Sequence, residues 1–149
     1  MDAALIKQFF DCCHFARKIL ELMPPLPQGM TPRHIRIIDV ISQLEAAGSP
    51  VRVSDISAAL KATRPSVTRL VAELAAQGVL TKTASPTDGR VIYVQLTAKG
   101  RDCCDFYVKK YHAWVGAHLT DITPDDVAAT ARTFKQFYAA LKNNPAPKP

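Results

Sequence analysis

The sequence predicts a mainly α-helical fold with a small β-hairpin. Most of the chain consists of segments in which apolar residues recur every three or four positions, the spacing of a helix with one buried face. The exception is 79–96, where two short strand-like runs flank a polar stretch. Two short helices precede this hairpin, so the order helix, turn, helix, hairpin favours a winged helix-turn-helix. With 149 residues, the chain has the length of one domain.

The first helix is predicted from Ala3 to Leu22, and Pro24 and Pro25 end it. One face of this helix is apolar and comprises Leu5, Phe9, Cys12, Phe15, Ile19 and Met23. The second helix is predicted to begin with Thr31 as N-cap and Pro32 at the first helical position. It ends before Gly48, and the side chains expected to face the core are Ile35, Ile38, Ile41 and Leu44.

The third helix is predicted to begin between Arg52 and Ser54. It is expected to bury Ile56, Ala59 and Leu60. The fourth helix follows a very short turn and begins after Thr63 as N-cap. Its core stripe has the helical spacing i, i+3, i+4, i+7 and consists of Val67, Leu70, Val71 and Leu74. Gly78 ends this helix.

The strands of the hairpin are predicted at Val79–Thr83 and Val91–Leu96, joined by a projecting polar loop. A fifth helix is capped by Thr97 and runs to about His118. A sixth helix opens at Thr123-Pro124, where two aspartates favour the positive end of the helix dipole. The Pro-rich tail, 143–149, is predicted to be disordered.

The charge of the chain favours a polyanionic partner. The net charge is +6, and residues 51–100 hold seven basic against three acidic side chains. No Gly-rich phosphate loop, nucleophile elbow or pair of catalytic carboxylates is present, so an enzyme is not expected. Neither a cofactor nor a metal site is expected, because no metal-ligand spacing occurs. No membrane-length apolar run or signal-peptide pattern occurs, so the expected location is the cytoplasm, with no membrane partner.

The four cysteines form two adjacent pairs, Cys12-Cys13 and Cys103-Cys104. Neighbouring residues on a helix point about 100° apart, so the members of a pair are poorly placed to bridge or to share a metal. The prediction is that these cysteines are reduced and buried as small apolar side chains.

The fourth helix carries the candidate DNA-binding residues. Its exposed side holds Arg64, Pro65, Ser66, Thr68 and Arg69 near the N-terminus. An α-helix fits the major groove of B-DNA, where arginine bonds guanine through two donors and Ser or Thr bonds bases or phosphates. In the wing, Arg90 is suited to a narrow minor groove, and Asp88 is placed to orient it.

The segment Asp88-Gly89-Arg90, followed after five residues by Leu96-Thr97-Ala98-Lys99-Gly100, resembles the DxR…LTxxG pattern of MarR-type regulators. Residues 53–60 and 67–74 are similar to the family's helix-turn-helix, so the motifs cover 53–100. Many members carry a second arginine where this chain has Gly89. The resemblance implies a homodimer with a winged-helix lobe at 31–100 and dimerisation helices at 1–23 and 98–142. It also implies a pseudo-palindromic double-stranded DNA operator and repression relieved by an effector.

Large apolar side chains in the two terminal segments independently indicate a dimer interface. These side chains are Phe9, Phe10, Phe15, Phe134, Phe137 and Tyr138.

Two mechanisms of release remain open. The family resemblance implies a pocket for a small lipophilic or aromatic ligand, and the candidate wall residues are Phe15, Tyr107, Tyr111 and Trp114. The alternative is a thiol-based peroxide sensor, for which Cys12 and Cys13 are the redox candidates, with His14 as the neighbour that would lower a thiol pKa. A third hypothesis is a winged-helix protein-interaction module that binds no DNA.

Overall fold

The computed structural model describes residues 1–144, 146 and 147. The chain divides into two compact units, Met1–Lys109 and Lys110–Pro149. The predicted disordered tail, 143–149, lies partly outside the described residues; Asn143 is the last residue of a helix, and Asn144 follows it as the C-cap.

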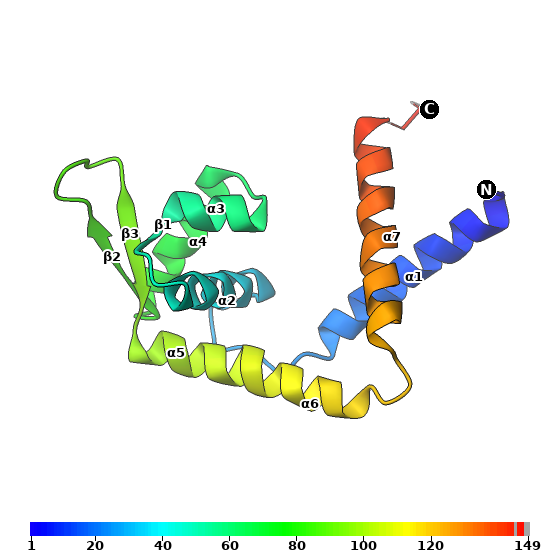
Figure 1. Ribbon diagram of the computed structural model, residues 1–149, viewed down its shortest axis with the longest axis horizontal. Coiled ribbons are helices and arrows are strands. Elements are labelled where there is room, and N and C mark those ends of the chain that lie inside the picture. Colours follow the sequence, from blue (N-terminus) through cyan, green and yellow to red (C-terminus); the bar gives the residue numbers. More distant parts are fainter. Residues whose placement is uncertain (145, 148–149) are drawn as a thin grey trace. The chain divides into compact units, whose positions relative to one another are not determined.

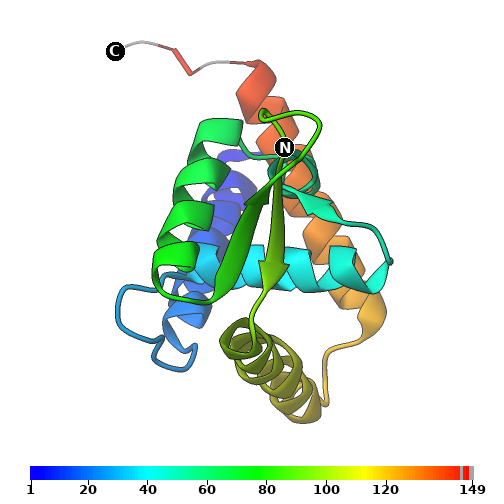
Figure 2. The same cartoon turned by 90° about the vertical axis from the view of Figure 1, so that its left-hand side faces the viewer.

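The first unit contains a helical lobe with a small sheet, preceded by the helix α1 (Ala3–Glu21). In chain order the lobe comprises α2 (Pro32–Ala46), β1 (Val51–Arg52), α3 (Val53–Leu60), α4 (Arg64–Ala76), β2 (Leu80–Ala84), β3 (Ile92–Leu96) and α5 (Ala98–Cys104). The strands form an antiparallel sheet in the order β1-β3-β2. The loop that closes the β2–β3 hairpin projects from the lobe, as the sequence predicted for a wing (Figure 1). Figure 2 views the lobe with this hairpin toward the reader and α4 beside it.

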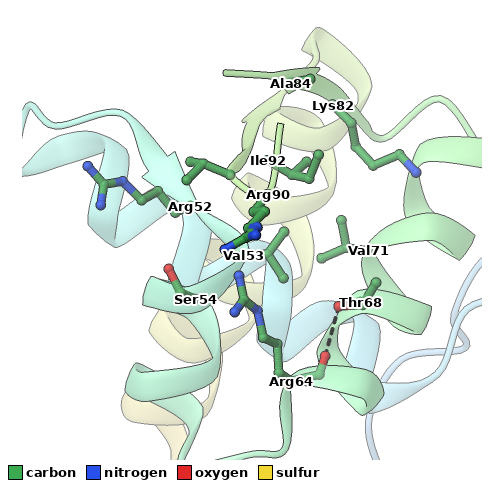
Figure 3. A pocket seen from close by; sticks show the side chains of 11 residues that line it. Arg52, Val53, Ser54, Arg64, Thr68, Val71, Lys82, Ala84, Arg90 and Ile92 are labelled. Carbon is green, nitrogen blue, oxygen red and sulfur yellow. Dashed lines mark hydrogen bonds between the residues drawn. The ribbon is translucent and has the colours of Figure 1, made fainter. Parts of the chain in front are cut away.

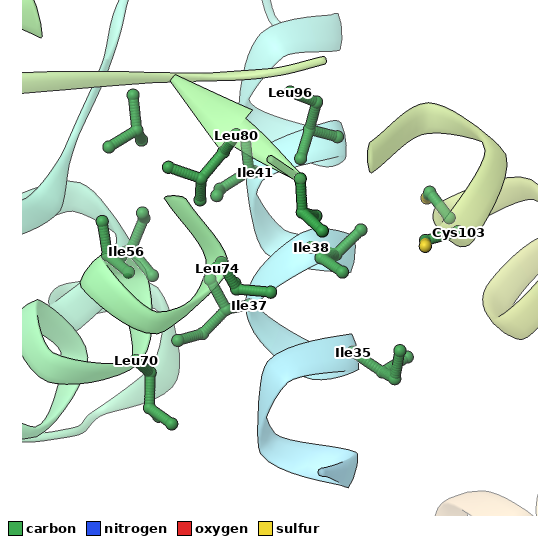
Figure 4. Packing of buried hydrophobic residues seen from close by; sticks show 14 of the residues in the cluster. Ile35, Ile37, Ile38, Ile41, Ile56, Leu70, Leu74, Leu80, Leu96 and Cys103 are labelled. Atoms are coloured by element: carbon green, nitrogen blue, oxygen red, sulfur yellow. The ribbon is translucent and has the colours of Figure 1, made fainter. Parts of the chain in front are cut away.

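The core of the lobe is built around α2. Isoleucines on opposite sides of this helix pack against α3 and α4 on one side and against α5 on the other (Figure 4). The side chains with less than 2% exposure are Ile37, Ile38, Ile41, Ile56, Leu74, Val67, Val71 and Val79. The core stripe predicted for α4 is buried in full, at Val67, Leu70, Val71 and Leu74. The lobe therefore holds α4 by one stripe and leaves its opposite face exposed.

Thr97 and Gly100 attach the hairpin to α5. The Thr97 hydroxyl accepts a hydrogen bond from the Gly100 backbone N–H at 3.2 Å, which caps α5 as predicted. The same hydroxyl lies 2.7 Å from the Gly78 carbonyl oxygen, to which it donates. A Cβ atom on Gly100 would overlap the Val79 carbonyl oxygen and crowd Leu96. Glycine is thus required where α5 meets the base of the wing.

The turn between α3 and α4 depends on Lys61. This residue has φ 50° and ψ 38°, a left-handed conformation, and it is the C-cap of α3. A left-handed residue reverses the chain within two positions, so α4 begins immediately after Thr63, its N-cap.

Several sequence predictions are wrong in detail. The strand β1 was not predicted, since two residues are too few to show an alternating pattern. Ala59 is exposed, and Leu60 and Leu44 are only half-buried, because α3 contacts the core through Val53 and Ile56 and because Leu44 lies near the end of α2.

The predicted fifth helix is interrupted by a π-helical turn, η1 (Asp105–Lys110), before it continues as α6 (Tyr111–His118). The boundary between the two units falls at the end of this turn.

The terminal helices have no buried residues. In α1 the exposed large apolar side chains include Leu5, Phe10, Phe15, Ile19 and Leu20. In α7 (Pro124–Asn143), within the second unit, they include Val127, Tyr138 and Leu141. A chain that exposes apolar helix faces of this kind normally covers them with a partner. Among the described residues, no helix is both long enough and apolar enough to span a bilayer.

Candidate nucleic-acid interface

The exposed face of α4 presents the side chains that the sequence singled out. Arg64, Pro65, Thr68 and Arg69 are exposed, and Ser66 is half-buried. Pro65 occupies the first turn of the helix, where its missing N–H costs no hydrogen bond. The Thr68 hydroxyl donates to the Arg64 carbonyl at 2.8 Å within the helix and keeps its lone pairs for an incoming donor.

A basic groove lies between the N-terminal half of α4 and the wing. It has a volume of about 720 Å³, and its lining includes Arg52, Arg64, Lys82, Arg90 and Thr68. None of the described lining residues is acidic. In Figure 3 the side chains of Arg64 and Arg90 extend into the groove, whereas the charged ends of Arg52 and Lys82 point away from its centre on either side. We call this surface the wing flank of α4.

The wing turn has a different internal contact from the one predicted. The Asp88 carboxylate accepts a hydrogen bond from the backbone N–H of Arg90 at 2.9 Å. The backbone N–H of Val91 donates to the Asp88 carbonyl, also at 2.9 Å. Asp88 therefore shapes the backbone of the turn and leaves the Arg90 guanidinium available to a ligand. A Cβ atom added at Gly89 would meet no other atom within 4 Å.

The opposite side of α4 faces the N-terminus of α2 and is organised differently. Here the Arg69 guanidinium donates to Glu73 Oε1 at 2.9 Å, and Glu73 Oε2 lies 2.8 Å from Nε2 of the buried His34. Arg33 lies beside these residues in the wall of a cavity of about 390 Å³. We call this surface the α2 flank.

Four residues on these two flanks were not predicted from the sequence as part of the site. Arg52 and Lys82 were counted only as charges, and their position in the groove follows from the pairing of β1 and β2 with β3. His34 and Glu73 lie 39 residues apart, and nothing in their local sequence indicates that they meet. The one available signal was Glu73 four residues after Arg69, the spacing of a helical ion pair.

The proposed effector residues are distributed over both units. Phe15 in α1 is 65% exposed, and the Tyr107 hydroxyl in η1 donates to the Pro25 carbonyl at 3.1 Å. In the second unit the rings of Tyr111 and Trp114 stack with centroids 6.1 Å apart. A ligand site formed by these side chains remains a prediction.

The four cysteines do not share one environment, contrary to the prediction that all are buried. Cys103 and Cys104 are buried, but Cys12 is exposed and Cys13 half-buried, because α1 packs no face into the lobe. Burial raises the pKa of the Cys103 thiol, which disfavours its reactive thiolate form. All four cysteines are free thiols.

Comparisons with known proteins agree with this geometry. No protein of curated function matches the sequence. Among solved structures, FabT of Streptococcus pneumoniae in complex with DNA has a TM-score of 0.66 at 21% identity, covering 95% of this chain and 99% of FabT. PcaV of Streptomyces coelicolor, in complex with its natural ligand, has a TM-score of 0.64 at 15% identity, covering 94% and 96%. BpsR of Bordetella bronchiseptica, whose DNA binding is regulated by 6-hydroxynicotinic acid, has a TM-score of 0.66 at 13% identity, covering 90% and 98%.

At these identities the structural likeness establishes the fold, a winged helix-turn-helix between terminal helices. The sequence of the lobe matches the model of the MarR family over residues 28–91. That range runs from the approach to α2 through α4 to the wing turn with Asp88 and Arg90. Over residues 28–91 the chain is thus similar to the MarR family, and its fold is the winged helix-turn-helix of the solved structures above.

Proposed function

We propose that this chain is a sequence-specific repressor that binds a pseudo-palindromic operator as a homodimer in the cytoplasm. The observation that carries the proposal is that the N-terminal half of α4 and Arg90 are both exposed around a groove whose described lining residues include no acidic side chain. Winged helices bind duplex DNA by placing one helix in the major groove and a basic β-ribbon at the adjacent minor groove. In this arrangement the major groove is contacted by the exposed residues of α4, which are Arg64, Pro65, Ser66, Thr68 and Arg69. The wing contact is formed by Asp88 and Arg90.

The homodimer is supported by the apolar faces of the terminal helices. One recognition helix per chain contacts one half-site, and two-fold symmetry then places two half-sites about one helical turn apart. Segments 1–23 and 98–142 would supply the interface. Sedimentation at micromolar concentration, with and without DNA, tests this; a stable monomer under both conditions would contradict it.

DNA binding is tested by selecting bound sequences from a random duplex pool. The expected result is an inverted repeat, with affinity that falls steeply as salt increases because phosphate contacts release counterions. A protein-interaction module would select no duplex, and any residual retention of DNA would lack a repeat. This outcome would remove the whole proposal.

Release from the operator is proposed to follow binding of a small lipophilic or aromatic ligand, near Phe15, Tyr107, Tyr111 and Trp114. The aromatic character of these residues supports the hypothesis, as does the fact that two proteins of the same fold, BpsR and PcaV, respond to or bind a small molecule. A ligand that prefers the conformation unable to bind DNA shifts the population toward it, so operator DNA must weaken ligand binding by the same factor.

The exposed Cys12 keeps the peroxide-sensor alternative open to test. Operator affinity is measured with a panel of aromatic acids, and separately after mild peroxide treatment of wild-type protein and of the Cys12→Ser, Cys13→Ser double variant. The expected result is release by at least one aromatic acid and no release by peroxide. Release by peroxide that the double variant abolishes, with no ligand response, would replace the ligand mechanism with the thiol mechanism.

A further inference from the structure

The side chain of Arg69 is linked through Glu73 to the buried His34, in a hydrogen-bond network that reaches from α2 to the exposed face of α4. We infer that His34 and Glu73 are specificity-determining positioning residues: they fix the Arg69 guanidinium at one place on the recognition helix, so that it contacts a base and not any nearby phosphate. This inference rests on the proposed DNA-binding function and deepens it.

His34 is the one buried polar side chain among the described residues, with 2% exposure. The backbone N–H of Thr31 donates to His34 Nδ1 at 3.0 Å, so Nδ1 is an acceptor. With Nδ1 accepting, Nε2 is the ring nitrogen that carries a proton, and it donates to Glu73 Oε2 at 2.8 Å. Both ring nitrogens thus form hydrogen bonds. Nδ1 accepts from the backbone at the N-terminus of α2, and Nε2 donates to the Glu73 carboxylate of α4.

Glu73 in turn divides its two oxygens between two partners. Oε2 accepts from His34, and Oε1 accepts from Arg69 at 2.9 Å. An exposed ion pair at spacing i, i+4 is by itself too weak to immobilise a long side chain, because solvent and conformational entropy oppose it. Here the Glu73 side chain is 38% exposed, and its second carboxylate oxygen is bound to His34, a residue of the core. The anchoring by His34 is what makes Glu73 a fixed acceptor.

The tether leaves Arg69 able to contact DNA. Its side chain is 62% exposed, and a guanidinium has five N–H donors, of which Glu73 Oε1 takes one. Contact with guanine O6 and N7 requires two donors in a fixed orientation, whereas phosphate contact tolerates many orientations. An arginine whose guanidinium is already held in place loses less conformational entropy when it binds a base. It is also less able to reorient toward the nearest phosphate on an unrelated sequence. The expected consequence is a higher ratio of operator affinity to nonspecific affinity.

The test uses the full-length protein and two probes, the operator duplex selected from the random pool and a scrambled duplex of equal length. Dissociation constants are measured at several salt concentrations for the wild type and for Glu73→Gln. The glutamine retains an oxygen that accepts from His34 but removes the charge that holds Arg69. The expected result is a roughly five- to tenfold lower ratio of operator to scrambled affinity, part of the discrimination that one bidentate base contact supplies.

Removing a negative charge near DNA also strengthens all binding, so a double-variant cycle separates the two effects. In the Arg69→Ala background, Glu73→Gln is expected to change the affinity for both duplexes equally and to leave their ratio unchanged. An unchanged ratio in the single variant, an increased ratio, or an equal fall in the Arg69→Ala background would each overturn the inference. If the wild type selects no duplex, the proposed function fails first, and that result is distinguishable from all three.

Two substitutions of His34 provide the matched control. His34→Asn keeps a polar group near the Nδ1 position for Thr31 but loses the donor to Glu73, whereas His34→Gln places an amide N–H near the Nε2 position. We expect the asparagine variant to lose selectivity and the glutamine variant to retain most of it, at comparable melting temperatures. A fall in selectivity that follows only the melting temperature would assign His34 a purely structural role and overturn its part in the inference.

Discussion

The two flanks of α4 carry positive charge in different ways. On the wing flank, Arg64 and Arg90 extend into a groove whose described lining contains no carboxylate. On the α2 flank, Arg69 is bound to Glu73, and Glu73 to the buried His34. Free cations at an open groove suit phosphate binding, which is strong, salt-dependent and independent of sequence. A tethered arginine suits discrimination between bases, so we expect α4 to supply affinity on the wing flank and selectivity on the α2 flank.

The largest expected effect comes from Gly100→Ala, which disturbs the junction between α5 and the base of the hairpin that carries the wing. The new methyl group would overlap the Val79 carbonyl oxygen, a backbone atom that cannot move aside without displacing the hairpin. We expect a loss of about 3 kcal/mol or more in the free energy of unfolding. Chemical denaturation measures it, and a stability within 1 kcal/mol of wild type would show that the contact between α5 and the wing is easily deformed.

Arg90→Ala tests the wing flank directly. Loss of a charge-assisted contact is expected to weaken binding by about 1.5–3 kcal/mol in each half-site, on operator and scrambled duplexes alike. The slope of log affinity against log salt should become shallower by about one unit per half-site. A loss confined to operators with A·T-rich flanks would instead indicate that Arg90 senses minor-groove width. Unchanged affinity and unchanged slope on all duplexes would remove the wing from the mechanism.

Arg69→Ala tests the α2 flank. The expected loss is about 1–3 kcal/mol in each half-site on the preferred base, and close to zero on duplexes with another base at that position. Binding to a panel of single-position operator variants measures this. Equal losses across the panel would make Arg69 a phosphate contact and would erase the difference between the two flanks.

The smallest effect is expected from Asp88→Ala. The substitution removes the acceptor for the Arg90 backbone N–H and leaves the guanidinium chemically intact. We expect about 0.5–1.5 kcal/mol weaker DNA binding, in the same pattern as Arg90→Ala but smaller. Stronger binding would mean that the negative charge of Asp88 repels the DNA more than its turn contact helps.

Much of the fold could be predicted because it depends on local sequence. The N-caps Thr31, Thr63, Thr97 and Thr123 and the prolines that follow three of them define helix starts within a few residues. The core stripe of α4 is a periodic pattern within one helix, so its exposed face, and with it Arg64 and Arg69, could be inferred without a structure.

Tertiary structure alone decided the features that depend on residues distant in sequence. The hydrogen bond between His34 and Glu73 requires that α2 and α4 pack at a specific angle, and no local sequence pattern encodes that angle. Strand β1 exists because β3 offers Val94 and Tyr93 as partners to Val51 and Arg52, not because two residues form a strand by themselves. The sequence by itself determined which faces are apolar and which are charged, since these follow from side-chain period. The fold determined which charges are free and which are held, since that depends on the neighbours that packing supplies.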